Sequence, residues 1–272
     1  MSSTVLDFAQ LKSNMKSSWI AGDFGRIANF TTQAAEDFVH RTRIKPGCRL
    51  LDVACGTGNT AIPATRAGAT VTGIDIASNL LDQARQRAAA EHLDIRFEEG
   101  DAEELPFPDR SFDGVLTMFG AMFAPRPERV AAELLRVCKP GGFIAMANWT
   151  PEGFVGKSFK ITSTLLPPPP GLPAPALWGD EPTVRKRLLS GASSLAMARQ
   201  KIWFHYPFSP RETVEFFRQY FGPTHVAFSK LDQAGQATLA AQLESLWAEH
   251  NTATDGTTRV EAEYLEVRAT RA

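Results

Sequence analysis

LLDVACGTGNT, residues 50–60, is the stretch that decides the fold. Its apolar residues lead directly into a glycine-rich turn, which is typical of a buried strand that ends at a ligand-binding loop. Gly56, Gly58 and Ala61 match the pattern G-x-G-x-x-G/A of dinucleotide-binding folds. The glycines alone do not identify the ligand, because any tight turn between a strand and a helix favours glycine.

Strand-like and helix-like segments alternate along the chain around this stretch. The predicted strands are 49–54, 70–74, 94–98, 113–118, 142–148, 200–208 and 258–268, and the predicted helices after residue 45 are 59–67, 77–92, 125–138, 210–220 and 233–249. Such alternation is typical of an α/β fold. We therefore expect a Rossmann-like, seven-stranded, mostly parallel sheet with helices on both faces, together with N-terminal helices and an inserted lid segment.

The 272 residues are expected to form a single domain. Residues 1–44 are predicted to be an N-terminal helical cap, and residues 45–150 the core that binds a cofactor. Residues 151–198 contain the run Pro167–Pro170 and are predicted to be a lid or substrate-binding insertion, largely without regular structure. Residues 199–272 would add the last strands and helices and complete the sheet.

The composition argues against several classes of partner. Lys and Arg number 29 and Asp and Glu number 30, so no basic excess indicates nucleic-acid binding. The three cysteines lack metal-ligand spacing, so no metal is expected. No apolar run is long enough to span a membrane, and no signal peptide is recognised at the N-terminus. We expect a cytoplasmic monomer or homodimer that acts on a small molecule.

Three acidic residues at predicted strand ends indicate the kind of ligand. Asp52 lies just before the glycine loop, where a carboxylate would disfavour a pyrophosphate and favour a cation. Asp75 ends the second strand, a position suited to accepting hydrogen bonds from ribose hydroxyls. Asp101 follows the third strand, where it can accept a hydrogen bond from an adenine amino group. The set favours S-adenosylmethionine, which carries an ammonium and a sulfonium group, over a nicotinamide dinucleotide.

Four longer stretches resemble a known family. They are LLDVACGTGN, TGIDIASNLLDQAR, GDAEELPFPDRSFD and ELLRVCKPGGFIAMANW, in this order within residues 45–150. The sequence resembles the class I S-adenosylmethionine-dependent methyltransferases, in particular the branch similar to ubiquinone and menaquinone biosynthesis methyltransferases (methyltransferase type 11). Trp19-x-x-Gly22-Asp23 and residues 149–154 also resemble a bacterial set of small-molecule methyltransferases.

The resemblance implies a role for each part of the cofactor site, with S-adenosylhomocysteine as the product. The methionine moiety would be held around the glycine loop, the ribose after the second strand, the adenine after the third, and apolar surface would come from the end of the fourth. In that order the implied residues are Asp52, Ala54, Gly56, Thr57 and Gly58, then Asp75 and Ile76, then Asp101 and Ala102, then Met118 and Phe119.

Aromatic residues near the expected mouth of the site are candidates for an acceptor pocket. They are Trp19, Phe24, Phe123, Trp149 and Phe154. For Trp19 the alternative is that it only packs the N-terminal helices onto the sheet.

The sequence predicts methyl transfer without an identified catalytic residue, because none of the five histidines lies in a pattern typical of a general base. Displacement at a sulfonium releases a neutral leaving group, so positioning and exclusion of water are the main tasks. We expect a methyltransferase for a small aromatic or apolar acceptor, whose methylated atom stays open. The alternatives are a non-catalytic S-adenosylmethionine-binding protein and an NAD-dependent oxidoreductase, although no Tyr-x-x-x-Lys pair is present.

Overall fold

The computed structural model describes residues 6–272, in which seven strands form one sheet in the order β3-β2-β1-β4-β5-β7-β6. The strands are β1 (Arg49–Val53), β2 (Thr70–Asp75), β3 (Arg96–Glu99), β4 (Phe112–Met118), β5 (Cys138–Trp149), β6 (Ala192–Tyr206) and β7 (Thr258–Arg271). The first five are parallel, and β7 runs antiparallel between β5 and β6. The predicted fold class is confirmed.

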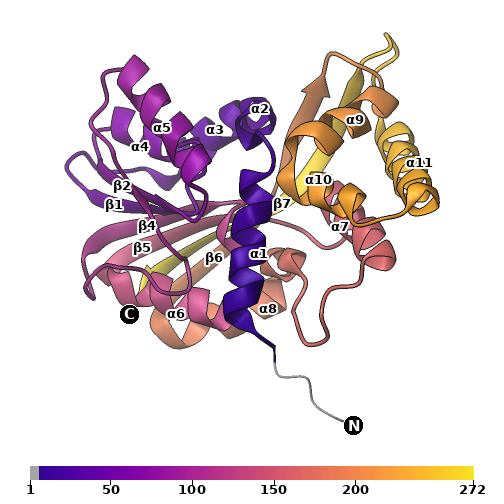
Figure 1. The fold of residues 1–272 in the computed structure, drawn as a ribbon. Coiled ribbons are helices and arrows are strands. Elements are labelled where there is room, and N and C mark those ends of the chain that lie inside the picture. The colour runs from indigo at the N-terminus through magenta and orange to yellow at the C-terminus, as the bar shows by residue number, and fades with distance from the viewer. Residues whose placement is uncertain (1–5) are drawn as a thin grey trace.

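Helices cover both faces of this sheet (Figure 1). The helices of one face are α3 (Thr32–Thr42), α4 (Ala61–Arg66) and α5 (Ser78–Ala90), and those of the other are α6 (Pro127–Val137) and α8 (Glu181–Leu188). Strand β1 lies between them with four of its five residues buried, which explains its continuous apolar sequence. The two helical layers therefore leave the carboxyl ends of β1, β2 and β4 as the accessible edge.

A second group of helices packs at the far ends of β6 and β7, to the right in Figure 1. Its members are α7 (Phe154–Leu165), α9 (Pro210–Tyr220), α10 (Gly222–Ser229) and α11 (Gln233–His250). Tyr206 at the end of β6 is fully buried there against Phe217 and Trp247. The long β6–β7 pair thus belongs to the sheet at one end and to this helical group at the other.

Two short N-terminal helices lie between the sheet and the second helical group (Figure 1). They are α1 (Phe8–Ile20) and α2 (Phe24–Ala28), and residues 21–23 form the turn between them. Residues 1–5 of the predicted helical cap lie outside the described residues. Gly22 is required at this turn, because a Cβ there would meet the Tyr220 carbonyl oxygen at 2.3 Å.

The structure corrects several sequence-based boundaries. Residues 151–198 contain α7 and α8, and their last seven residues already belong to β6, so the irregular part is mainly the proline-rich segment between the two helices. Residues 222–229, between two predicted helices, form the further helix α10, and Pro223 lies in its first turn, where it is tolerated. Strand β5 begins at Cys138 rather than at 142, since a register shift opposite Phe112 and Gly114 accommodates the Pro140–Gly142 segment.

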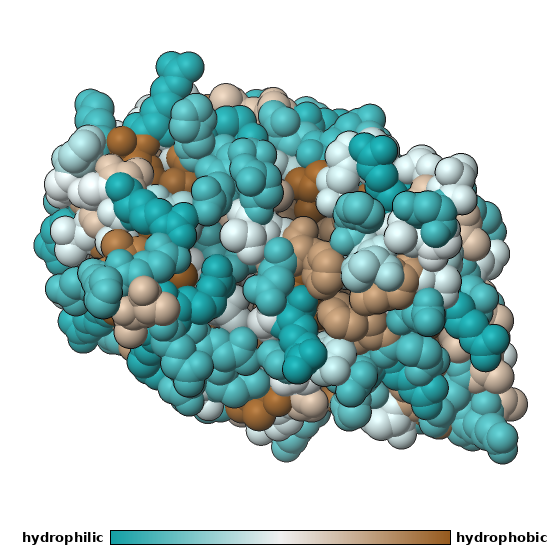
Figure 2. Space-filling model, turned by 90° about the horizontal axis from the view of Figure 1, so that it is seen from above, coloured by the Kyte–Doolittle hydropathy of each residue, from teal (hydrophilic) through white to brown (hydrophobic). Residues whose placement is uncertain are grey.

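Most large apolar side chains are buried, and Figure 2 shows one face on which hydrophilic residues dominate and apolar ones gather near the middle. The exposed exceptions among the described residues are Ile20, Leu189 and Trp203. Within residues 6–272, no helix has both the length and the apolar character that crossing a membrane requires.

Candidate functional site

A pocket opens at the carboxyl ends of β1, β2 and β4, where ligands bind in open α/β sheets. The N-terminal helices line one part of it, and the segments at the ends of four strands, β1 to β4, line the rest. The lining residues are Lys12, Met15, Trp19, Phe24, Ala28 and Thr31, then 54–57, Asn59 and Thr60, then Asp75, Ile76 and Leu80, then 100–102, and finally 118–121 and 123–125. Two of the three strand-end acids, Asp75 and Asp101, and three of the aromatic candidates are therefore brought together from distant parts of the chain.

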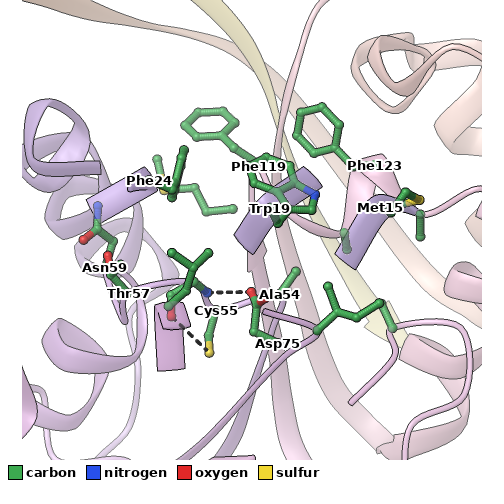
Figure 3. A pocket seen from close by; sticks show the side chains of 18 of the residues that line it. Met15, Trp19, Phe24, Ala54, Cys55, Thr57, Asn59, Asp75, Phe119 and Phe123 are labelled. Carbon is green, nitrogen blue, oxygen red and sulfur yellow. Dashed lines mark hydrogen bonds between the residues drawn. The ribbon is translucent and has the colours of Figure 1, made fainter. Parts of the chain in front are cut away.

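The glycine loop and Asp75 form one hydrogen-bonded unit at the base of the pocket (Figure 3). The Gly56 amide donates to Asp75 Oδ2 at 2.8 Å, and the Ala77 amide donates to Oδ1 at 2.9 Å. Gly56 has a φ of 52°, which favours glycine at this turn. Burial raises the pKa of Asp75, although the two amide bonds oppose that shift. The carboxylate is held rigidly and keeps lone pairs for a ligand.

Polar contacts fix the second half of the loop. Arg87 Nη1 on α5 donates to the Thr57 carbonyl oxygen at 2.7 Å and to Asn59 Oδ1 at 2.6 Å. Asn59 Nδ2 in turn donates to the Ala28 carbonyl oxygen at 2.8 Å. These contacts hold the loop against α5 on one side and α2 on the other. The backbone amides of the loop are therefore fixed in position before a ligand binds.

Asp52 and Gly58 do not face the pocket, in contrast to the sequence-based expectation. Asp52 is fully buried behind the loop, and neither of its carboxylate oxygens has a hydrogen-bond partner. Burial, together with the nearby charge of Asp75, raises the pKa of Asp52 to about 8. Gly58 lies outside the lining, and its φ of 82° is a backbone conformation that favours glycine, so its role is to shape the turn. Both residues support the site from outside it.

At the other end of the pocket, Asp101 belongs to a network of charged groups. Its Oδ1 accepts a hydrogen bond from the Glu103 amide at 2.8 Å, and its Oδ2 lies 2.5 Å from Lys12 Nζ. Lys12 Nζ also lies 2.7 Å from the fully buried Glu103, which accepts two bonds from Arg126. Helix α1 is thus bound by charge to the loop that follows β3, and Lys12, Met15 and Trp19 of this helix line the pocket.

The part of the pocket opposite Asp75 is aromatic. Figure 3 shows Trp19, Phe24, Phe119 and Phe123 on one side, facing Ala54, Cys55 and Asp75 on the other. The Trp19 ring lies 5.6 Å from that of Phe24 and 5.1 Å from that of Phe123, both edge to face. These aromatic side chains are half-buried, so they both pack the N-terminal helices and present apolar surface to the pocket.

Trp149 and Phe154, the other two aromatic candidates, lie outside the pocket lining. Trp149 is buried behind Phe119, with the two rings stacked 3.7 Å apart. Phe154 begins α7 and packs on Trp247 at 4.4 Å. No residue of 151–198 lines the pocket, although Phe159 in this segment contacts the lining residue Phe123, with ring centroids 5.6 Å apart; three residues of α1 line the pocket directly.

Sequence reasoning missed Lys12 and Met15 as pocket residues. Lys12, Met15 and Trp19 follow one another at spacings of three and four residues, which places them on one face of α1. That spacing was visible in the sequence, but the packing of α1 over the loop after β3 was not. Within residues 6–272, no cluster of His, Cys, Asp and Glu suits a metal ion.

Comparison with known proteins identifies the family. A family model described as a methyltransferase domain matches residues 51–146. An uncharacterized protein of Mycobacterium tuberculosis is 39% identical over 239 residues, which cover 85% of this chain and 86% of the relative. A demethylmenaquinone methyltransferase of Deinococcus radiodurans is 42% identical over 132 residues, 47% of this chain and 53% of that enzyme. The chain belongs to the class I S-adenosylmethionine-dependent methyltransferases.

The methyltransferase shares its fold with solved methyltransferases of low sequence identity. Phosphoethanolamine N-methyltransferase 2 of Haemonchus contortus, solved with S-adenosylhomocysteine, superimposes with a TM-score of 0.55 and is 21% identical; the match covers 88% of this chain and 52% of that one. The present methyltransferase falls in the branch similar to ubiquinone and menaquinone biosynthesis methyltransferases, and its cofactor is S-adenosylmethionine.

The pocket residues fit this cofactor. A carboxylate fixed by two amides suits a ribose, and the preorganised glycine loop offers amides to a carboxylate. A close approach of backbones also shapes the pocket, since a Cβ on Gly120 would meet the Ala54 carbonyl oxygen at 2.5 Å. The acidic residues of the lining, Asp75 and Asp101, are compatible with a cationic ligand.

Proposed function

We propose that this methyltransferase transfers the methyl group to a small apolar or aromatic acceptor bound in the aromatic part of the pocket. The observation that carries the proposal is that Trp19, Phe24, Phe119 and Phe123 line the same pocket as the glycine loop and Asp75. Apolar walls of this kind bind planar or apolar molecules and exclude water from the reacting groups.

The cofactor would lie along the strand ends. Ala54, Gly56 and Thr57 would hold its methionine moiety, with Asp52 and Gly58 acting from behind the loop. Asp75 and Ile76 would hold the ribose, Asp101 and Ala102 the adenine, and Met118 and Phe119 would supply apolar surface. When bound, S-adenosylmethionine supplies a methyl group on a positively charged sulfur. The chain's task is to orient this group toward the acceptor atom and to keep water out.

The pocket offers no free general base, which narrows the acceptor class. All residues that line the pocket lie within residues 6–272. Those with titratable side chains are Lys12, Cys55, Asp75 and Asp101. Lys12 and Asp101 pair with each other, and Asp75 accepts two amide bonds. Burial raises the pKa of the Cys55 thiol well above its usual range. An acceptor that ionises near neutral pH, such as an acidic carbon or a phenol whose pKa is lowered by electron-withdrawing substituents, would release its proton to solvent and need no base.

A binding and transfer experiment tests the proposal. S-adenosylhomocysteine should bind more tightly than NAD in isothermal titration calorimetry. Radiolabelled S-adenosylmethionine should then transfer its methyl group to phenols and naphthols more readily than to polar amines or sugars. Tighter binding of NAD would contradict the cofactor assignment, and transfer only to polar acceptors would contradict the acceptor class.

A matched pair of variants tests the ribose assignment. Asp75→Asn should weaken S-adenosylhomocysteine binding by about 1–3 kcal/mol, the scale of lost hydrogen bonds to a charged group. Asp82→Asn changes an exposed carboxylate on α5, outside the pocket lining, and should leave the affinity unchanged. Equal affinities of the two variants would refute the role of Asp75.

A further inference from the structure

Phe119 occupies an unusual backbone position at the end of β4. Its φ is 58°, in the left-handed region that bulky residues avoid. Its amide nevertheless donates to the Ala147 carbonyl oxygen at 2.8 Å, so the pairing of β4 with β5 continues through this residue. A bulky side chain kept in this backbone conformation at a pocket wall indicates that its direction matters to the site.

Two aromatic rings hold the Phe119 side chain from behind. Trp149 stacks on it with ring centroids 3.7 Å apart and planes within 6° of parallel. Tyr264 meets it edge to face at 5.3 Å. Phe119 lines the pocket, whereas Trp149 and Tyr264 do not. The stack therefore leaves one side of the Phe119 ring for the pocket and fixes the other against the sheet.

The Trp149 and Tyr264 rings, which contact Phe119 from behind, are themselves held in place. Trp149 is the last residue of β5 and lies directly opposite Tyr264 in the antiparallel pairing with β7. The Tyr264 hydroxyl accepts a hydrogen bond from Arg41 Nη2 at 2.7 Å, and Arg41 also pairs with Glu266. The two rings behind Phe119 are thus fixed by strand pairing and by a charged anchor on α3.

We propose that Trp149 is a positioning residue for the acceptor. It holds the Phe119 ring in the pocket wall and thereby sets the size of the acceptor site and the acceptor's position, without touching the acceptor itself. The proposal rests on the proposed function, in which the aromatic part of the pocket binds the acceptor. Without the indole, the Phe119 ring can move into the space behind it, and the wall of the acceptor site loses its fixed position.

Three variants separate this role from general packing. Trp149→Leu removes the stacking plane, and Trp149→Phe keeps an aromatic ring there. Phe204→Leu is the matched control. Phe204 is buried, and its ring centroid lies 5.7 Å from that of Trp149. Its side chain does not line the pocket and forms no aromatic pair with Phe119. Thermal unfolding of all three establishes that they are folded at the assay temperature.

The decisive readout is the separation of cofactor binding from acceptor selectivity. Because Phe119 is also proposed to supply apolar surface to the cofactor, we expect the dissociation constant of S-adenosylhomocysteine to rise in Trp149→Leu, but by less than threefold. Its kcat for the best phenol or naphthol should fall at least tenfold, and its preference between phenol and 2-naphthol should shrink. Trp149→Phe and Phe204→Leu should stay within threefold of the wild type. If Trp149→Leu matches Phe204→Leu in kcat and in selectivity, the proposal is overturned.

A second readout does not depend on the acceptor. The enzyme is labelled with 4-fluorophenylalanine in place of Phe119, and its fluorine resonance is recorded with and without S-adenosylhomocysteine. In the wild-type background we expect one sharp resonance, and in Trp149→Leu a broadened or shifted one. If the wild type methylates none of the phenols, the proposed acceptor class fails, while this resonance still decides the role of Trp149. An unchanged sharp resonance in Trp149→Leu overturns it.

Discussion

Lys12 Nζ lies 2.5 Å from Asp101 and 2.7 Å from the buried Glu103, so a single ammonium group joins the N-terminal helix to the loop after β3. Burial alone would lower the pKa of Lys12, but its bonds to the two carboxylates raise it above the ordinary value, and the group stays charged. No residue of α1 is itself buried, which makes these ionic contacts important for keeping the helix over the pocket.

Lys12→Ala should weaken S-adenosylhomocysteine binding about three- to tenfold, because α1 loses its main contact with the cofactor end of the pocket and Glu103 loses a charged partner. Lys16→Ala is the control, since Lys16 on the same helix pairs with Glu99 at the end of β3, and such exposed pairs contribute little. Calorimetric titration at low and high salt provides the measurement. The affinity of the wild type should approach that of Lys12→Ala as salt rises, and equal losses in both variants would argue against the role of Lys12.

Gly120→Ala should damage both stability and binding. The added Cβ would meet the Ala54 carbonyl oxygen at 2.5 Å and the Ala54 Cβ at 2.6 Å, so the ends of β1 and β4 must move apart. We expect a loss of about 1–3 kcal/mol in the free energy of unfolding, the usual cost of overpacking, and weaker S-adenosylhomocysteine binding.

Urea unfolding and calorimetry measure these two effects. Gly141→Ala is the comparison, because Gly141 has a φ of 75° but no atom within 4 Å of the added Cβ. It should lose only about 1 kcal/mol, from backbone strain, and should bind the ligand normally. Normal binding by Gly120→Ala would show that the approach of Ala54 and Gly120 does not shape the pocket.

The position of Asp75 and Asp101 was predictable from the sequence, and that of Asp52 was not. The carboxyl ends of parallel strands meet at one edge of a sheet, so acids that follow two such strands gather in one pocket. Asp52 lies inside a strand that is buried on both faces, where apolar alternation carries no information about side-chain direction. The prediction that the Asp52 carboxylate favours a cationic ligand therefore assumed that this side chain faces the ligand, whereas the sheet buries it.

The aromatic part of the site was predictable only in outline. Trp19 and Phe123 are 104 positions apart, and their contact depends on how α1 packs against the loop after β4. Trp149 was expected near the mouth of the site as part of an acceptor pocket, but a strand-end residue can point into the pocket or into the core. Here Phe119 lines the pocket, and Trp149 lies behind it in the core.

Asp52 should make the methyltransferase less stable as the pH rises from about 4 to about 8. Its pKa in the folded chain is raised to about 8, while an unfolded chain has the ordinary value of about 3.9. Between these values the unfolded chain has released a proton that the folded chain keeps, so rising pH favours unfolding, by at most about 1.4 kcal/mol per pH unit. Above pH 8 both states are ionised, and this contribution levels off.

Asp52→Asn removes the titrating group at nearly constant volume, so its stability should lack this pH dependence. The stability of the variant minus that of the wild type should therefore increase steadily between pH 5 and pH 8, as measured by urea unfolding at each pH. Asp113→Asn is the control for a carboxylate in the same sheet, because bonds from Lys139 and the Arg49 amide lower the pKa of Asp113, and its titration lies below this range. A difference between Asp52→Asn and the wild type that stays constant with pH would mean that Asp52 is already ionised in the folded protein.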